Sequence, residues 1–253
     1  MSTPPAPPAG CERRTEARRG RPATGLIAHV LPPGVASAEA FGDPPHPPLP
    51  AAEAALVARA APPRREEFAT GRTLARRALA DLGLPAAVVL RDEQGAPAWP
   101  AGVVGSITHC PGYRAVAVAR VGTVPALGVD AEPASPLPDG VLEMISLPDE
   151  RALMRRLADA RPGVCWERVL FCAKEAVYKA WFPLARRWLD FEDARVEVDP
   201  SGTFTAGLLV PGPRVDDVPL TAFTGRWLSR DGLVVAAVSG RRCDATRRAA
   251  PGR

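Results

Sequence analysis

The sequence predicts an α+β protein of two similar halves with pseudo-twofold symmetry, each a small antiparallel sheet packed on a long helix. Two observations lead to this prediction. A helical stretch followed by several strand-like stretches occurs twice along the 253 residues. Turn signals rich in Gly, Pro, Ser and Asp separate the strand-like stretches at short intervals, as in antiparallel sheets. We expect the halves to span residues 26–126 and 127–240.

The first half begins with an apolar run at 26–31 that predicts a short strand, followed by a proline-rich loop. Residues 51–60 and 64–82 have helical character, and Gly83 ends the second helix. Strands are expected after it at 86–90, 103–108, 113–120 and 124–131. The turn Pro111-Gly112 predicts that the last three form an antiparallel meander.

The second half repeats this order. Residues 147–160 and 164–181 are predicted helices, and Pro183 is expected to end the second one. Strands are expected at 194–198, 203–210, 220–228 and 233–239. Turn signals at 200–202 and 230–232 separate neighbouring strands and again indicate antiparallel pairing.

The positive charge of the chain belongs to its ends. The formal net charge is +4 and the pI is about 9.0. Residues 1–25 and 241–253 hold ten arginines and three carboxylates. Residues 26–240, called the body of the chain below, have 22 cations against 25 carboxylates. We expect disordered basic tails and no nucleic-acid partner, because the body has no basic stripe with interleaved aromatics. A binding protein that holds nucleic acid or acidic partners through its tails stays an alternative.

Cysteine usage and the N-terminus suggest a reducing compartment. The chain has five cysteines and no C-x-x-C pair, which disfavours a disulfide scaffold or zinc ribbon. The N-terminal MSTPPAPPAG has no apolar core of a secretory signal. No apolar run approaches the roughly 18–20 residues needed to span a bilayer. We therefore expect a cytoplasmic protein with no membrane partner.

A pair of carboxylates lies at the end of the strand predicted at 124–131. Asp130 and Glu132 are two residues apart, so both side chains point to one face of the strand. Two such charges need a cation or a shared proton, and oxygen ligands without His or Cys favour Mg²⁺. The alternative is a solvated strand end with two exposed acids.

The only two lysines lie on one predicted helix. Lys174 and Lys179 contrast with thirty arginines, and Glu175 shares a helix face with Lys179 four residues on. That pair could simply stabilise the helix, but arginine would do so equally well. Lysine differs in its compact ammonium, whose pKa can be lowered, so the choice favours a point charge on a phosphate or a proton donor.

A third candidate site lies at the end of the strand predicted at 103–108. Ser106 and His109 could form a catalytic triad with Asp130, although Ser106 lacks the G-x-S-x-G turn of such nucleophiles. Cys110 could act as a nucleophile only if a base lay beside it. His109 could instead contact a phosphate.

These motifs, in this order, resemble the 4′-phosphopantetheinyl transferases of the surfactin-synthetase-activating type. The branch that they resemble most is that of enterobactin synthase component D, with its actinobacterial members. The resemblance covers about residues 50–240. It rests on RREEFATGRTLARRALADLGLP (64–85), WPAGVVGSITHCPGY (99–113), LGVDAEP (127–133), PLPDGVLEMISLPDER (136–151) and WERVLFCAKEAVYKAWFPLARRWLDFEDARV (166–196).

The resemblance implies a Mg²⁺-dependent enzyme, with Mn²⁺ as an alternative, that moves the phosphopantetheine arm of coenzyme A onto a serine of an apo acyl or peptidyl carrier protein. Adenosine 3′,5′-bisphosphate is the other product. Asp130, Glu132 and Glu175 would hold the metal, and Glu175 would take the proton from the serine. Lys179 would neutralise or protonate the leaving phosphate, and Lys174 would contact the pyrophosphate.

The resemblance also assigns the nucleotide end of coenzyme A to the first half. The residues implied are Arg64, Arg72, Arg91, Ser106 and His109. Carriers of fatty-acid, polyketide, non-ribosomal peptide and siderophore pathways all fit the chemistry. Two halves in one chain would supply internally what a dimer supplies otherwise, so we expect a monomer.

The presence of lysine rather than arginine at position 179 can be tested by substitution. Replacing Lys179 by arginine preserves the charge but puts a broad guanidinium where a compact ammonium is expected. We expect Lys179→Arg to lose transfer activity, measured as the rate of carrier modification. Full activity in this variant would remove the chemical reason for a lysine at this position.

Overall fold

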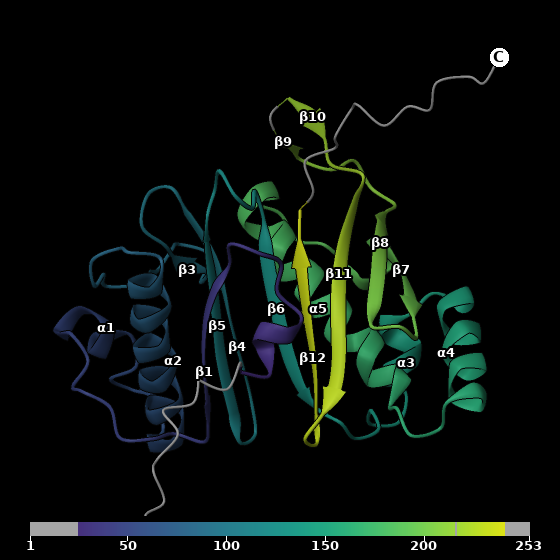
Figure 1. Cartoon of the computed structure of the whole chain (residues 1–253), viewed down its shortest axis with the longest axis horizontal. Coiled ribbons are helices and arrows are strands. Elements are labelled where there is room, and N and C mark those ends of the chain that lie inside the picture. The colour runs from purple at the N-terminus through teal and green to yellow at the C-terminus, as the bar shows by residue number, and fades with distance from the viewer. Residues whose placement is uncertain (1–24, 216, 241–253) are drawn as a thin grey trace, which may run out of the picture.

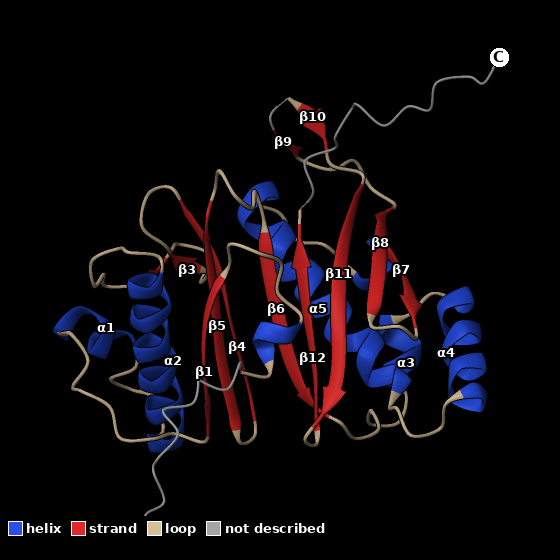
Figure 2. Ribbon diagram, viewed as in Figure 1, coloured by secondary structure: helices blue, strands red, loops and turns tan. Residues whose placement is uncertain are grey.

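The computed structural model describes residues 25–215 and 217–240, and the predicted tails lie outside these residues except for Gly25. Two antiparallel sheets lie beside each other, and a long helix packs on each (Figures 1 and 2). The predicted α+β class with small antiparallel sheets is confirmed. The exact division at residue 126 stays a prediction.

The first sheet has the strand order β1 (Ala36–Phe41), β5 (Tyr113–Arg120) and β4 (Val103–Cys110). Helix α2 (Pro62–Asp81) covers one face, where Leu74, Ala78 and Leu79 pack on the strands. Short elements complete this half: η1 (Ile27–His29), α1 (Ala51–Leu56), β2 (Leu90–Arg91) and β3 (Pro97–Ala98).

The second sheet has the strand order β6 (Leu127–Pro133), β12 (Leu233–Ser239), β11 (Ala222–Arg230), β8 (Thr203–Leu208) and β7 (Ala194–Asp199). Helix α5 (Trp166–Ala185) packs against it and lies behind β6 and β12 in Figure 1. The remaining elements are α3 (Val141–Ile145), α4 (Pro148–Ala160), η2 (Phe191–Asp193), β9 (Arg214–Val215) and β10 (Val218–Pro219). In both halves the first strand pairs with the last, as similar halves require.

The two sheets meet along a seam between β4 and β6 that side chains close. The hydroxyl of Ser106 accepts a hydrogen bond from the Val129 N–H at 3.0 Å. The hydroxyl of Thr108 accepts one from the Ala131 N–H, also at 3.0 Å. Both contacts advance by two residues in the same direction, so the strands run parallel. Hydroxyl groups therefore satisfy N–H groups of β6 that face away from its ladder with β12.

An apolar core shared by both halves supports this seam. Side chains from η1, β5, β6 and β12 pack together in it, among them Ile27, Ala117, Val129 and Val235. The core ties the halves by burial, so the few polar contacts at the seam need only fix the register.

Several sequence predictions need correction. The expected strand at 26–31 is the 3₁₀ turn η1, because the Glu39 carboxylate accepts the N–H groups of Leu26 and Ile27 at 2.7 and 2.8 Å. The expected strand at 86–90 shrinks to β2. The meander ends after β5, since β6 pairs with β12 and begins the second sheet.

Helix α5 also differs from its prediction, because it continues through Pro183 to Ala185. A proline this close to the helix end removes a single backbone hydrogen bond, and the helix ends at Arg186 in a left-handed conformation with φ of 51°. The pattern also missed β1 and the short helix α3. Among the described residues, no helix has the length and apolar character to cross a bilayer.

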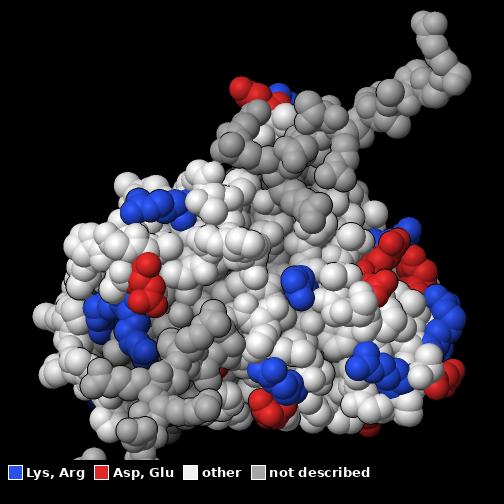
Figure 3. All heavy atoms as spheres, viewed as in Figure 1, with Lys and Arg blue, Asp and Glu red and all other residues white. Residues whose placement is uncertain are grey.

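The surface of the body matches its nearly balanced charge. On the face shown in Figure 3, lysine and arginine side chains are scattered among acidic ones and separated by wide uncharged areas. The described residues form no basic stripe on this face.

Gly128 brings β6 close to α5 and so controls how the metal-binding candidates approach the helix. A Cβ atom at this position would lie 1.9 Å from the carbonyl oxygen of Ala176 and 2.7 Å from the nitrogen of Ala180. Both neighbours are helix backbone and cannot move alone. Only glycine permits this approach.

Gly128→Ala is expected to lower the free energy of unfolding by about 3 kcal/mol, because the strand and the helix must separate to admit the methyl group. Denaturant unfolding measures the loss. Gly207→Ala in β8 is the matched control, since a Cβ there meets nothing within 4 Å, and we expect a change within about 0.5 kcal/mol. Equal effects of the two substitutions would contradict the close approach.

Candidate functional site

Asp130 is the centre of the site. It lies on β6 and is 4% exposed. Its Oδ1 accepts a hydrogen bond from the Thr108 hydroxyl at 3.0 Å and contacts the Lys179 ammonium at 2.6 Å. Its Oδ2 is buried and has no hydrogen-bond partner among the described residues. Since a buried carboxylate oxygen without a partner is costly, this atom has the environment of a ligand atom.

Two more carboxylates share the electric field of Asp130. Burial, then Asp130, raises the pKa of Glu132 and also that of Glu175. Lys179 and, for Glu132, Arg168 lower these pKa values but do not cancel the rise. Burial and the repulsion among the three carboxylates thus disfavour their charged forms, so the three carboxylates together lack sufficient positive charge nearby.

Lys179 supplies the cation that faces Asp130. Burial disfavours its charge, but the charge and hydrogen bond of Asp130, together with the charge of Glu175, outweigh burial and raise the pKa of Lys179. Lys179 is therefore a charged ammonium at neutral pH. The sequence had left open a lowered pKa and a role as proton donor, and in this arrangement the pKa is not lowered. Its role as a point charge is consistent with this environment.

The three carboxylates fit a divalent cation in their chemistry. They offer oxygen atoms alone, which suits Mg²⁺ or Mn²⁺, and one oxygen has no partner. Within residues 25–215 and 217–240, however, no three acidic, His or Cys side chains converge into a preformed cluster. Arg168 holds Glu132 at 3.1 Å and also donates to the carbonyls of Ser135 and Pro136 at 2.9 and 2.8 Å.

The first half contributes cations to the region that also holds the three carboxylates, called the cleft below, since the charges of Lys179 and Asp130 both act on His109. The guanidinium of Arg64 lies 3.2 Å from Nε2 of His109, and Nδ1 of His109 lies 3.2 Å from Glu67. Because guanidinium only donates, Nε2 must accept and the ring proton sits on Nδ1. Partial burial and then the charge of Arg64 lower the pKa of His109 to about 4. His109 is therefore neutral at physiological pH.

Arg72 and Arg91 share the ring of Phe68. Their guanidinium carbons lie 4.3 and 5.6 Å from the ring centre. Burial and nearby charges, Arg91 among them, lower the pKa of Arg72 to about 10, and its Nε has no partner among the described residues. Neither arginine has an ion pair within the described part of the chain, so this cluster favours an anion.

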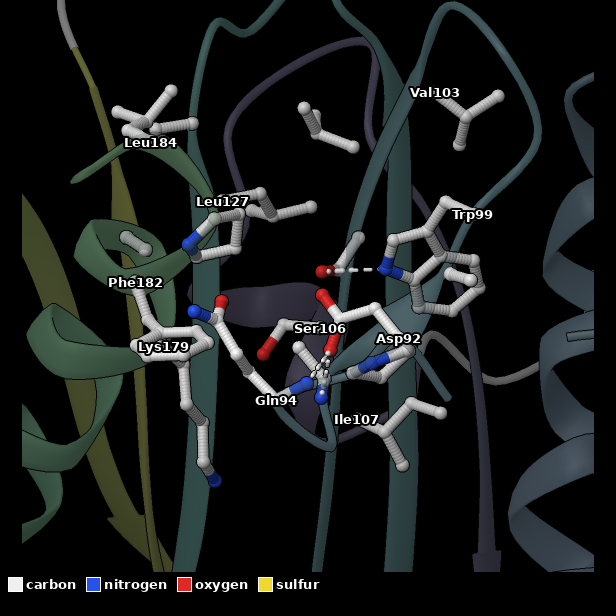
Figure 4. Close-up of a pocket in the computed structure, with 18 of the residues that line it drawn as sticks. Asp92, Gln94, Trp99, Val103, Ser106, Ile107, Leu127, Lys179, Phe182 and Leu184 are labelled. Atoms are coloured by element: carbon white, nitrogen blue, oxygen red, sulfur yellow. Dashed lines mark hydrogen bonds between the residues drawn. The ribbon is translucent and has the colours of Figure 1, made fainter. Parts of the chain in front are cut away.

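A cavity of about 540 Å³ opens between the β2–β3 hairpin, β4 and the end of α5 (Figure 4). Ser106 and Lys179 both line it, and Trp99 forms part of its wall. The indole N–H of Trp99 donates to the Gly105 carbonyl at 2.9 Å and fixes that wall. Ser106 lines the cavity, but its hydroxyl is engaged at the seam.

A narrower cavity of about 140 Å³ lies beside Glu175. It is lined mostly by apolar side chains, including Tyr178, Trp188 and Phe191. Tyr178 lines both cavities and packs on Trp188 with ring centres 4.8 Å apart. The two spaces thus flank α5 where Glu175 and Lys179 project.

The structure does not bring Lys174 to the phosphate site, which corrects the role implied by the resemblance. Its ammonium contacts Glu150 at 2.9 Å and donates to the carbonyls of Phe191 and Ala194 at 2.6 and 3.1 Å. Lys174 is 4% exposed and lies inside the fold. Its ammonium is therefore held by the protein itself, although Lys174 and Glu175 both line the smaller cavity.

The side chains of Ser106 and His109 do not form the contact that a serine hydrolase needs. The ring nitrogens of His109 contact Arg64 and Glu67, and the hydroxyl of Ser106 bonds to the backbone of Val129, so no Ser–His pair forms. Burial, then Glu132, raises the pKa of Cys110 to about 11, which disfavours a thiolate nucleophile. Burial likewise raises the pKa of Cys172 well above its usual value.

Thr108 and Arg168 are among the residues of the site that the sequence analysis missed. Thr108 orients Asp130 and closes the seam, and Arg168 holds Glu132. A weak signal existed for Thr108, because it shares a strand face with Ser106 next to His109. Arg168 gave no signal, since a helical arginine near an acidic strand is common.

Comparisons with known proteins agree with this geometry. Residues 52–119 match the model of the 4′-phosphopantetheinyl transferase N-terminal domain, and residues 126–232 match that of the 4′-phosphopantetheinyl transferase superfamily. The chain belongs to this superfamily, whose members transfer phosphopantetheine from coenzyme A to a carrier protein. The family and the activity predicted from the motifs are confirmed.

Two relatives match most of the chain, and a third matches about half of it. The 4′-phosphopantetheinyl transferase Svp of Streptomyces mobaraensis is 54% identical over 218 residues, which are 85% of this chain and 89% of Svp. The 4′-phosphopantetheinyl transferase PptT of Mycobacterium tuberculosis is 50% identical over 223 residues, 84% of this chain and 97% of PptT. Enterobactin synthase component D of Salmonella typhi is 32% identical over 124 residues, 47% and 48% of the two chains, so that branch is more distant.

His109→Gln is expected to weaken the pH dependence of stability between about pH 7 and pH 5. The unfolded histidine gains a proton below about pH 6.5, whereas the folded one stays neutral to about pH 4. The unfolded state thus binds more protons in this window, and the free energy of unfolding falls as pH falls. Denaturation at both pH values tests this, with His29→Gln on η1 as control. An unchanged slope in His109→Gln would contradict the prediction.

Proposed function

We propose that this transferase depends on a divalent cation, Mg²⁺ or Mn²⁺, held by Asp130, Glu132 and Glu175. The observation that carries the proposal is the buried Asp130 Oδ2 without a partner, next to two carboxylates whose pKa values are raised. When bound, the cation supplies charge neutralisation and polarisation at the pyrophosphate. Binding there requires Glu132 to share or leave its contact with Arg168.

Coenzyme A fits across the cleft with its nucleotide end on the first half. The arginines at 64, 72 and 91 would hold the 3′-phosphate, since guanidinium matches terminal phosphates in two-point contacts. Neutral His109 would contact the same phosphate. The 540 Å³ cavity, with Ser106 in its lining, would take the nucleoside. The narrow apolar cavity at Tyr178 and Trp188 suits the thin pantetheine arm.

The chemical roles follow from the environment of each group. Glu175 has a raised pKa and would accept the proton of the carrier serine, directly or through a water. The serine oxygen then attacks the phosphorus, and the bond to the leaving phosphate breaks. Lys179 would stabilise the charge on that leaving group, which departs as adenosine 3′,5′-bisphosphate. Positioning and charge provide the catalysis, without a covalent enzyme intermediate.

The partner is an apo acyl or peptidyl carrier protein or domain. Fatty-acid, polyketide, non-ribosomal peptide and siderophore carriers all present a serine of the required chemistry. We further propose that the enzyme is a monomer, because both halves of the cleft come from one chain. We place it in the cytoplasm because its cysteine usage fits a reducing compartment. Nucleic acid and membranes have no role in this proposal.

The test is carrier modification followed by mass spectrometry. Wild-type protein with coenzyme A, Mg²⁺ and a panel of apo carriers should add the mass of one phosphopantetheine to a carrier serine. Glu175→Gln should lower the rate by about a hundredfold or more while preserving the fold, because the base and a metal ligand are lost together. Glu197→Gln on β7, exposed and remote, is the matched control and should be fully active.

Two outcomes would contradict the proposal. No mass addition to any carrier would overturn the assigned reaction. Full activity of wild type in excess chelator would overturn the role of the cation and leave the transfer reaction in place.

A further inference from the structure

Lys174 is held by three oxygen acceptors in the interior of the second half. Its ammonium meets the Glu150 carboxylate at 2.9 Å and the carbonyls of Phe191 and Ala194 at 2.6 and 3.1 Å. The side chains of Lys174 and Glu150 are 3% and 1% exposed. The ammonium has three donors, and three acceptors surround it.

Glu150 is equally engaged. One oxygen accepts the Val196 N–H at 2.7 Å, and the other accepts the Leu147 N–H at 2.7 Å in addition to Lys174. The carboxylate therefore joins the start of α4, the edge strand β7 and helix α5. The Val196 N–H that it occupies belongs to the open edge of the sheet, so the carboxylate also covers that edge.

This pair sets one wall of the narrow cavity. Phe191 and Ala194, whose carbonyls Lys174 holds, both line it. Lys174 itself lines it and is followed directly by Glu175 in the helix. Fixing Lys174 therefore fixes both the rotation of α5 at Glu175 and the distance from α5 to η2.

We propose that Lys174 and Glu150 form a positioning pair that sets the width of the pantetheine cavity and the direction of Glu175. This inference rests on the proposed function, because it assigns the arm of coenzyme A to that cavity. Lys174 makes no phosphate contact in this arrangement. To reach a phosphate it would have to leave Glu150 as an unpaired buried charge.

Two ligands separate positioning from phosphate contact. Coenzyme A carries the pantetheine arm, and adenosine 3′,5′-bisphosphate carries the nucleotide and phosphates without it. Lys174→Met should weaken the binding of coenzyme A about tenfold or more and lower kcat, since misplacement by about 1 Å can cost about a hundredfold. Binding of the bisphosphate, measured by calorimetry in Mg²⁺, should stay within about twofold of wild type.

A double variant keeps the test valid if Lys174→Met fails to fold. Lys174→Met with Glu150→Gln removes both charges, so no unpaired buried charge remains, and the amide oxygen still accepts one backbone N–H. We expect it to fold and to show the same selective loss of coenzyme A binding. Glu53→Gln is the matched control: it alters a buried carboxylate of the first half that pairs with Arg76 at 2.7 Å and accepts the Val89 N–H at 2.9 Å.

The control should change both affinities by the same factor or leave both unchanged. Equal weakening of both ligands in the folded double variant would show that Lys174 acts on phosphate and would overturn the inference. If the variant binds coenzyme A as tightly as wild type and only its free energy of unfolding is lowered, the pair has a structural role alone. That result would also overturn the inference. Failure of wild type to bind coenzyme A would refute the proposed function itself, which is a different result.

Discussion

The hydrogen bonds of Thr108 are the contact on which the rest of the site depends. Its hydroxyl accepts the Ala131 N–H across the seam and donates to Asp130. The same atom thus joins the two sheets and turns one oxygen of Asp130 towards Lys179, which leaves the other free as a ligand. A single side chain thus contributes both to the contact between the sheets and to the geometry of the site.

Buried ion pairs in both halves hold a long helix to the elements around it, and the pair of the second half also lies next to a residue of the site. Glu53 and Arg76 tie α1 and the segment at Val89 to α2, and Glu150 and Lys174 tie α4, β7 and η2 to α5. Such pairs add little net stability against apolar replacements, but they specify which elements meet. In the second half that specification reaches the residue next to Glu175, so structural and functional demands fall on adjacent positions of one helix.

Most long elements could be predicted because their signals are local. The predicted strand at 233–239 matches β12 in full, and Gly83 follows the end of α2 by two residues. The strand predicted at 26–31 is wrong because an apolar run fits a buried 3₁₀ turn as well as it fits a strand. The 3₁₀ turn is stabilised by the Glu39 carboxylate, which lies outside the run. Periodicity paired Asp130 with Glu132 and Glu175 with Lys179, but only the family resemblance joined the two pairs, whose charges act on one another in the structure. It could not show which side of α5 Lys174 faces, because that depends on Glu150 and η2.

The distribution of charge across the cleft has a consequence for how an anion can bind. Arginines at 64, 72 and 91 come from the first half, whereas Asp130, Glu132 and Glu175 come from the second. The charge on each side is mixed, because Glu67 pairs with Arg64 in the first half and Lys179 pairs with Asp130 in the second. An anion can meet the arginines directly, whereas it can approach the three carboxylates only where a cation lies between them. The two sides thus place different demands on a phosphate: one side can bind it unaided, and the other can bind it only together with a metal ion.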